Sequence, residues 1–439
     1  YKRQLPDRDV FAIDAGADPP IVTDSFGSVG TVLYNMAVNP VSGRLYVSNT
    51  EARNEIRFST PVPFGPSPLR GHQHEARITV LEGSAVLPRH LNKHIAYDQE
   101  PIPTGTRERS LSTPLEMAVS DDGATLYVVA MGSNKLAIFS TAELENDSFV
   151  ADPADHIAVA GGPTGVVLDE ARERLYVLTR YDNSVVVVDL AARRETARMS
   201  LHNPEPYATI AGRPFLYDAT RTSSNGEASC ASCHVFGDLD GLAWDLGDAN
   251  EALLPNPNPS GDGQPLPDYH PLKGPMLTMS LRGMAHHGPL HLRGDRTGLH
   301  DTPPTSATNF RSSFRTFNAA FGALLGRDEG PIDDADMSKL AAFAERLTYP
   351  PNPIRSLDNS LNPSEQRGRA LFHAPIMFTT SPNERSCQSC HRVDPSAGRY
   401  GSDGLVRPSV NDDFKSSHLR NLYQKVGMFG MIAVGLTPT

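Results

Sequence analysis

Two short clusters hold all four cysteines of the chain, and each cluster ends in a histidine. The clusters are Cys230-Ala-Ser-Cys233-His234 and Cys387-Gln-Ser-Cys390-His391. Both read CxxCH, the attachment pattern of c-type haem, in which each thiol adds to one vinyl group of the porphyrin and the histidine reaches the iron. We therefore predict two covalently bound haems, held by the four cysteines, with the histidine of each cluster as an iron ligand.

A CxxC pair also occurs in structural disulfides, in four-cysteine zinc sites and in thioredoxin-like redox pairs. Those sites do not explain why a histidine follows both pairs. Because haem is attached covalently outside the cytoplasm, we predict a periplasmic or otherwise extracytoplasmic protein. The charged start Tyr1-Lys-Arg-Gln4 is not followed by the apolar core of a signal peptide, so we expect the natural chain to begin earlier.

The composition limits the classes of partner. The chain has 439 residues, a length typical of two or three domains, and 40 basic against 51 acidic residues give a net charge of −11. This balance gives no electrostatic support for binding nucleic acid or an anionic membrane. No apolar run approaches the roughly 18–20 residues of a membrane span. With 35 glycines and 37 prolines, many turns and long irregular connections are expected.

The N-terminal part, residues 1–205, contains a degenerate repeat of an apolar strand, a polar turn and a Leu-Tyr-Val strand. The repeated tyrosines are Tyr46, Tyr127 and Tyr176, and the last step of 49 residues has the length of one four-stranded propeller blade. The longer first step contains a stretch rich in Pro, His and Arg, about residues 60–111, which we interpret as an insertion. This region resembles the YVTN family of β-propellers. We predict an all-β, propeller-like domain that is incomplete, with an antiparallel sandwich as the alternative.

After Pro206 the pattern indicates helices and long loops. One helix is predicted from about Asp336, where apolar residues recur at helical spacing up to a stop at Pro350-Pro351. Another is predicted after Asn362, which can cap a helix with Pro at its first position and Glu365 reaching back.

A second repeat precedes the two CxxCH clusters. Gly212-Arg-Pro-Phe-Leu-Tyr217 lies before the first, and Gly368-Arg-Ala-Leu-Phe-His373 lies before the second. With Lys273-Gly-Pro-Met276, these segments resemble the bacterial di-haem cytochrome c peroxidase family, which includes the enzyme that matures methylamine dehydrogenase. We therefore predict two mainly α-helical cytochrome c domains, at residues 206–355 and 356–439.

The resemblance implies an activity and partners. In that family one haem is the hydrogen peroxide site, and the other passes electrons to it from a small donor protein, a cytochrome c or a cupredoxin. Here the haem at Cys387 would accept the electrons and the haem at Cys230 would reduce peroxide to water. The family usually has a calcium ion between its haem domains, for which we assign no ligands. The alternative functions are a non-enzymatic electron-transfer protein that uses the propeller as a docking module, and oxidation of a protein partner.

The resemblance also implies the sixth ligands of the irons. His270 lies where the family places the distal histidine of its first haem, and Met428 lies near where it carries an axial residue of the second. Met431 and Tyr423 are the alternatives to Met428. Thioether ligation raises the reduction potential, which suits the haem that holds electrons. His291 falls where the family has a Phe-Trp-Asp-Gly-Arg stretch between its two haems. It is the alternative ligand or an active-site residue.

Further residues are candidates around the haems. Trp244, the only tryptophan, follows the first cluster closely and is predicted to pack on the porphyrin. Arg293, Arg296 and Arg420 could pair with haem propionates, because planar guanidinium suits carboxylates, or form surface salt bridges. Glu329 and Asp295 are candidates for the catalytic carboxylate of a peroxidase. Without a positioned acid–base group, cleavage of the O–O bond would be slow, so electron transfer is the competing function.

Overall fold

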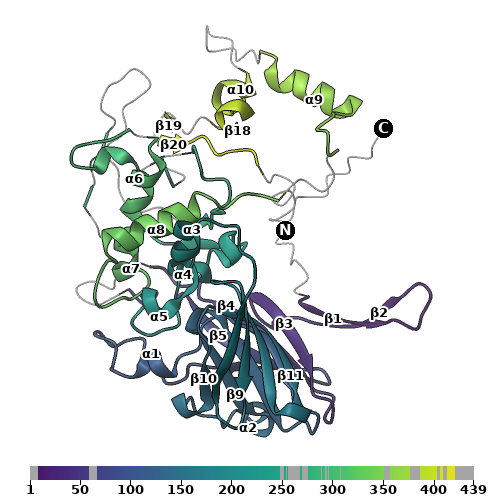
Figure 1. The fold of residues 1–439 in the computed structure, drawn as a ribbon. Coiled ribbons are helices and arrows are strands. Elements are labelled where there is room, and N and C mark those ends of the chain that lie inside the picture. Colours follow the sequence, from purple (N-terminus) through teal and green to yellow (C-terminus); the bar gives the residue numbers. More distant parts are fainter. Residues whose placement is uncertain are drawn as a thin grey trace. The chain divides into compact units, whose positions relative to one another are not determined.

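The computed structural model of the chain (Figure 1) contains two units. It describes residues 8–58, 67–247, 252–253, 255, 267–268, 275–287, 289–291, 294, 296–306, 308–350, 356–375, 386–402, 406–408 and 413–420. The first unit is made of Tyr1–Asn250, Leu272–Met279 and Ala319–Leu340, and the second of Glu251–Pro271, Ser280–Asn318 and Ala341–Thr439. Each unit therefore holds one CxxCH cluster.

Three four-stranded antiparallel sheets form most of the first unit. The first contains β3 (Val32–Val38), β4 (Leu45–Ala52), β5 (His74–Glu82) and β6 (Ala85–His90). The second contains β7 (Pro114–Val119), β8 (Thr125–Ala130), β9 (Lys135–Ser140) and β10 (His156–Ala158). The third contains β11 (Pro163–Asp169), β12 (Arg174–Thr179), β13 (Ser184–Asp189) and β14 (Arg194–Ser200). In each sheet every strand pairs with the next along the chain, which is the connection of a propeller blade.

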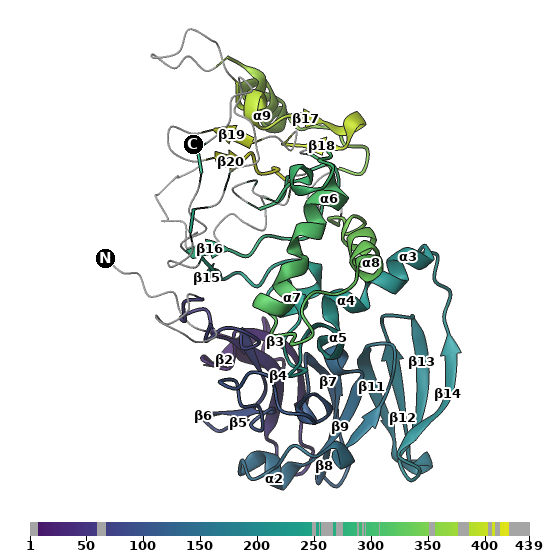
Figure 2. The same cartoon turned by 90° about the vertical axis from the view of Figure 1, so that its left-hand side faces the viewer.

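The sheets meet through their first strands. β7 contacts β3 on one side and β11 on the other, and Figure 2 shows the second sheet between the first and the third. Tyr46, Ile78, Leu126 and Phe139 belong to one buried cluster that joins the first two sheets. A sandwich would instead stack two sheets face to face. The N-terminal region is therefore β-propeller-like, as predicted.

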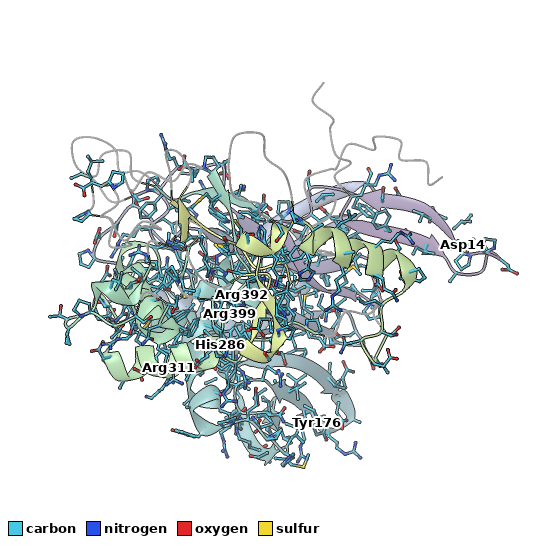
Figure 3. All side chains as sticks on the ribbon, turned by 90° about the horizontal axis from the view of Figure 1, so that it is seen from above. Asp14, Tyr176, His286, Arg311, Arg392 and Arg399 are labelled. Carbon is cyan, nitrogen blue, oxygen red and sulfur yellow. The ribbon has the colours of Figure 1, made fainter. Side chains whose placement is uncertain are left out.

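The Leu-Tyr-Val repeat forms the second strand of each sheet. In β12 the alternation is clear: Leu175 and Val177 are fully buried, whereas Tyr176 between them is partly exposed (Figure 3). The interpretation of residues 60–111 as an insertion is wrong in part, because β5 and β6 lie within this stretch and complete the first sheet. A separate hairpin of β1 (Val10–Asp14) and β2 (Ile21–Phe26) precedes the sheets.

Outside these sheets the elements are short. The helices are α1 (Thr106–Arg109), α2 (Thr141–Glu145), α3 (Tyr207–Gly212), α4 (Pro214–Tyr217), α5 (Ala219–Thr222), α6 (Phe310–Arg315), α7 (Ala320–Ala323), α8 (Asp334–Ala344), α9 (Pro363–His373) and α10 (Cys387–Cys390). The strand pairs are β15 (Ala243–Asp245) with β16 (Pro275–Leu277), β17 (Val393–Asp394) with β18 (Arg399–Tyr400), and β19 (Val406–Pro408) with β20 (Asp413–Lys415). The 3₁₀ turns are η1 (Met131–Ser133), η2 (Pro153–Asp155), η3 (Glu170–Arg172), η4 (Cys230–Ser232), η5 (Val235–Gly237), η6 (Gly298–His300), η7 (Thr316–Ala319) and η8 (Pro395–Ala397).

The prediction of two mainly α-helical cytochrome c domains is wrong. In the described residues after Pro206 only α8 and α9 reach 11 residues, and the other helices have four to six. Most of the regular structure of the described chain lies in the sheets.

The two longer helices do correspond to the predicted ones. In α9 the Asn362 side chain accepts from the Ser364 and Glu365 amides at 2.9 and 3.0 Å, and Glu365 accepts from the Asn362 amide at 2.8 Å. This is the reciprocal cap that the sequence predicts. Among the helices of the described residues, none is long and apolar enough to cross a membrane. The domain boundaries at residues 205/206 and 355/356 stay predictions.

Candidate haem-attachment sites

The first CxxCH cluster is a single tight turn, η4. The His234 amide donates to the Cys230 carbonyl at 3.0 Å. Two serines bond to each other across the turn: the Ser229 amide donates to Ser232 Oγ, and the Ser232 amide donates to the Ser229 carbonyl, both at 3.0 Å. Serine suits this position because its hydroxyl satisfies an amide that the first turn leaves unpaired.

The second cluster repeats these bonds in the other unit. In α10 the His391 amide donates to the Cys387 carbonyl at 2.8 Å. The Ser386 amide donates to Ser389 Oγ, and the Ser389 amide donates to the Ser386 carbonyl, both at 3.0 Å. Residues three apart in such a turn lie on one face, so each cluster presents two thiols on one side with a histidine beside them.

The surroundings of the first cluster favour the neutral, protonated form of its two cysteine thiols. None of the four cysteines is in a disulfide. Burial raises the pKa of Cys230 to about 12, and burial with the Asp240 carboxylate raises the pKa of Cys233 well above its usual value. Zinc binding and disulfide exchange need a thiolate, which is disfavoured here, whereas a haem thioether is neutral. The surroundings therefore fit covalent attachment.

His391 is held by one ring nitrogen. Its Nδ1 lies 3.1 Å from the carbonyl oxygen of Gly401 and 3.0 Å from that of Ser417, so Nδ1 carries the proton and donates. This hydrogen bond fixes the tautomer and leaves the lone pair on Nε2, which is the usual arrangement of a histidine that ligates a metal.

In the part of the chain that the structure describes, the ring of His234 is not held by such a hydrogen bond. Its Nδ1 is buried and has no hydrogen-bond partner among the described residues. Burial lowers the pKa of His234, while the Asp240 carboxylate and the backbones of Asp238 and Met279 act in the opposite direction. The imidazole is therefore neutral, which is the form that binds a metal. A buried ring nitrogen without a hydrogen bond is energetically unfavourable. Coordination of a metal or rotation of the ring would remove this cost.

Aromatic side chains lie around the first cluster. Trp244 on β15 is buried, and its Nε1 donates to Asp240 at 2.8 Å. Tyr34 lies edge-on to Phe236 at 6.1 Å between ring centroids, and burial raises its pKa to about 12. These flat apolar groups suit a porphyrin, so this neighbourhood fits the haem, and packing of Trp244 on it stays a prediction.

Several predicted residues lie outside the described residues. They are His270 and Met428 with its alternatives Met431 and Tyr423, and also Arg293 and Asp295. Their roles as distal ligands, propionate partner and acid stay predictions. The guanidinium of Arg420 in the second unit lies 4.1 Å from the ring centroid of Tyr400. Arg392, which follows His391 and is labelled in Figure 3, lies 3.9 Å from the Asp394 carboxylate.

The structure places the two predicted catalytic residues in different units. His291, in the second unit, has a left-handed backbone and packs edge-on against Phe317 at 4.8 Å. Glu329, in the first, is exposed and lies 3.3 Å from Arg107. A bond from its own backbone amide lowers the pKa of Glu329, as does Arg107, so the side chain is ionised.

Three buried groups are not among the predicted site residues. Glu227, three residues before Cys230, is fully buried among polar side chains of the first unit. In the second unit His287 is almost fully buried, and burial lowers its pKa to about 4. Lys415 donates to the His287 carbonyl oxygen, and burial lowers the lysine pKa to about 7. Single polar residues carry no pattern from which such burial could be predicted.

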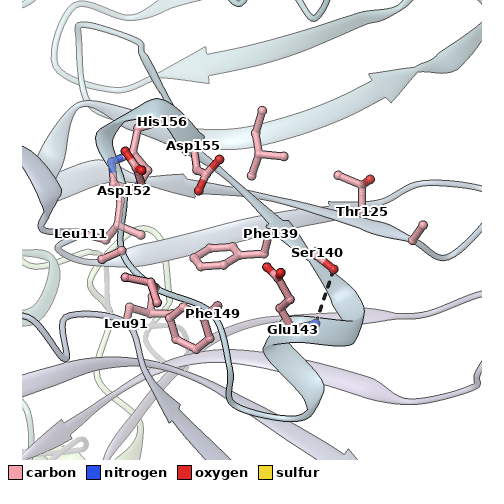
Figure 4. A pocket seen from close by; sticks show the side chains of 14 residues that line it. Leu91, Leu111, Thr125, Phe139, Ser140, Glu143, Phe149, Asp152, Asp155 and His156 are labelled. Carbon is pink, nitrogen blue, oxygen red and sulfur yellow. Dashed lines mark hydrogen bonds between the residues drawn. The ribbon is translucent and has the colours of Figure 1, made fainter.

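A cavity of about 260 Å³ lies in the second sheet of the first unit (Figure 4). Leu91, Leu111 and Phe149 form part of an apolar wall, and the carboxylates of Glu143 and Asp155 line it as well. None of its lining residues is among the predicted site residues.

Comparison with known proteins does not identify a family. No protein-family model matches the chain, and no curated protein matches it. Hydrazine synthase from Kuenenia stuttgartiensis is 22% identical in one structure, with a TM-score of 0.31 over 47% of this chain and 55% of that one. The β-propeller domain of the Trilobed protease from Pyrococcus furiosus is 9% identical, with a TM-score of 0.23 over 39% and 44%.

A third structure is also only weakly similar to this chain. A putative 6-phosphogluconolactonase from Bacteroides fragilis is 12% identical, with a TM-score of 0.26 over 46% of this chain and 65% of that one. The chain thus spans about half to two thirds of the length of these structures, and TM-scores at this level carry no argument. The propeller-like class is based on the sheets themselves, and the function on the two cysteine clusters.

Proposed function

We propose that the protein is a periplasmic or otherwise extracytoplasmic di-haem c-type oxidoreductase. One observation carries this proposal: two CxxCH clusters in separate units form the same serine-bonded turn, with the two cysteines of each cluster three residues apart and the histidine next to the second. A bound haem would supply one-electron transfer and an iron at which peroxide can bind.

The residues of the chain would hold and orient each haem. The two cysteines of a cluster fix the macrocycle at two points. The carbonyls of Gly401 and Ser417 keep the His391 ring in one orientation, with Nε2 available. Trp244 and Tyr34 provide apolar surface next to the first cluster and exclude water from it.

The proposed reaction is the reduction of hydrogen peroxide, H₂O₂ + 2e⁻ + 2H⁺ → 2H₂O. A small donor protein, a cytochrome c or a cupredoxin, would supply the electrons. The resemblance to the di-haem peroxidases supports this reaction, and with it His270 and Met428 as distal ligands, His291 as an active-site residue and a calcium ion.

One observation favours the alternative, a non-enzymatic di-haem electron-transfer protein with the propeller as docking module. Glu329 is exposed, and its carboxylate is paired with Arg107. An ionised carboxylate in an ion pair is a poor proton donor for cleavage of the O–O bond.

Haem content tests the proposal. The chain is exported in a host that attaches c-type haem, and haem is quantified by the pyridine haemochrome spectrum and by intact mass. We expect two haems per chain, and one in each of the variants Cys230→Ser/Cys233→Ser and Cys387→Ser/Cys390→Ser. A chain that carries zinc or a disulfide instead of haem would overturn the proposal.

Spectroscopy of the holoprotein separates peroxidase from electron carrier. A peroxidase shows a high-spin EPR signal during a redox titration and turns over peroxide. An electron carrier keeps both irons six-coordinate and low-spin in every redox state and shows no turnover.

A further inference from the structure

A buried carboxylate lies directly before the first CxxCH cluster. Glu227 Oε1 accepts from the Ala76 amide at 2.8 Å and from Asn92 Nδ2 at 2.7 Å, and Oε2 accepts from the Tyr97 hydroxyl. The side chain is fully buried. A carboxylate at such a position stays ionised only where donors and a cation compensate its charge. Its partners come from β5 and from the loop after β6, in the unit that contains Cys230.

His90 is the imidazole in contact with this carboxylate. Its Nε2 lies 3.5 Å from Glu227 Oε1 and 3.2 Å from the Tyr97 hydroxyl oxygen. The His90 side chain is 20% exposed, whereas that of Glu227 is 0% exposed. The pair therefore joins a partly exposed imidazole to a fully buried carboxylate, three residues before Cys230 in the chain.

The other charged and titratable groups around the pair are accounted for. They are Arg53, His72, His74, Glu75, Arg77 and His94.

Both arginines pair with Glu75, at 3.2 Å for Arg53 and 2.6 Å for Arg77. Burial lowers the pKa of His74 and keeps it neutral. His72 Nε2 lies 3.3 Å from Glu75 Oε1, and burial lowers the pKa of His94. His90 is therefore the imidazole whose nitrogen contacts Glu227 in the described residues.

We propose that the His90–Glu227 pair is a redox-linked proton site for the haem held by Cys230 and Cys233. The pair binds its proton more tightly when that haem is reduced and less tightly when it is oxidised. This inference rests on the proposed function, because it requires a redox group at the first cluster. A proton held in step with an electron also suits peroxide reduction, which consumes both.

The expected coupling follows from distance. Three residues of extended chain span at most about 11 Å, which bounds the separation of the Glu227 and Cys230 backbones. If the haem charge lies roughly 10 Å from the pair, at an effective dielectric constant of about 20, one unit of charge changes its proton affinity by roughly tenfold. The midpoint potential of the first haem should therefore fall as the pH rises, and this fall should extend over an interval of about one pH unit.

The experiment uses the holoprotein with both haems. The midpoint potential of each haem is measured between pH 5 and 9, with signals assigned by the single-haem variants, and proton uptake on reduction is followed with an indicator in weak buffer. The test variant is Glu227→Gln. The matched control is Glu145→Gln, because Glu145 also accepts from a tyrosine hydroxyl, that of Tyr46 at 2.6 Å, and pairs with an arginine.

We expect a pH-dependent potential and proton uptake in the natural protein and in Glu145→Gln, and loss of both in Glu227→Gln. His90→Gln should give the same loss and replaces Glu227→Gln if that variant does not fold. Two haems with pH-independent potentials, or equal loss in the Glu145 control, would overturn this inference alone. A chain without haem absorbance would overturn the proposed function with it.

Discussion

Replacement of Glu227 by alanine should strongly destabilise the first unit. The substitution removes the acceptor of three donors, the Ala76 amide, Asn92 Nδ2 and the Tyr97 hydroxyl, and it leaves the His90 imidazole without its carboxylate partner. A buried donor without acceptor costs about 1–3 kcal/mol, and breaking a buried ion pair from one side costs about 3–5 kcal/mol. Because these effects overlap, we expect Glu227→Ala to lower the free energy of unfolding by about 3–5 kcal/mol.

Glu227→Gln should cost less, about 1–2 kcal/mol, since its amide oxygen can still accept from Ala76 and Asn92. Urea unfolding at pH 7, followed by far-UV circular dichroism, measures both variants in the same haem-loaded state. Glu82→Ala is the control, because Glu82 is half exposed and pairs with Arg44 on the surface, where an ion pair contributes at most about 1 kcal/mol. If Glu227→Ala costs no more than Glu82→Ala, the reasoning about the buried carboxylate is refuted.

Three further predictions concern the same unit. Because its buried partners lower the pKa of Glu227 to about 2 from the ordinary 4.5, the stability that it contributes is present above pH 4.5 and lost as pH falls toward 2. Acid unfolding should thus show a loss of roughly 3 kcal/mol that Glu227→Gln lacks, and identical acid curves would contradict it. Leu126→Ala, at a fully buried core position, should cost about 2–5 kcal/mol in urea, and the control Leu178→Ala, at a 41% exposed position, clearly less. Emission of Trp244, the only tryptophan, should be quenched by energy transfer in the holoprotein and recover in Cys230→Ser/Cys233→Ser, and equal emission in both would place the haem away from Trp244.

Local features of the fold could be predicted well from the sequence. The cap of α9 depends on residues within four positions of one another, Asn362 to Glu365, so neighbouring chemistry was enough to identify it. The strands around Tyr46, Tyr127 and Tyr176 were predictable because a period of two in apolar residues marks a strand with one buried face.

Other predictions were wrong because the sequence pattern was ambiguous. β5 lies in the stretch rich in Pro, His and Arg that was assigned to an insertion. Its Ala76 amide bonds to Glu227, 151 residues further along the chain, and such a contact cannot be read from local sequence. The two mainly α-helical domains were inferred from family-like motifs and short apolar runs, and neither fixes helix length. In the described residues, all but two of the helices after Pro206 have only four to six residues.

The proposed chemistry follows from the sequence by itself, since a cysteine pair followed by histidine is an attachment pattern made of residues that are neighbours in the chain. The same is true of the serine-bonded turn that presents each pair. Only the tertiary structure decided the environment of those groups. Ala76, His90, Asn92, Tyr97 and Glu227 come together across more than a hundred residues of chain, and a buried charge acquires its partners only when strands and loops close around it.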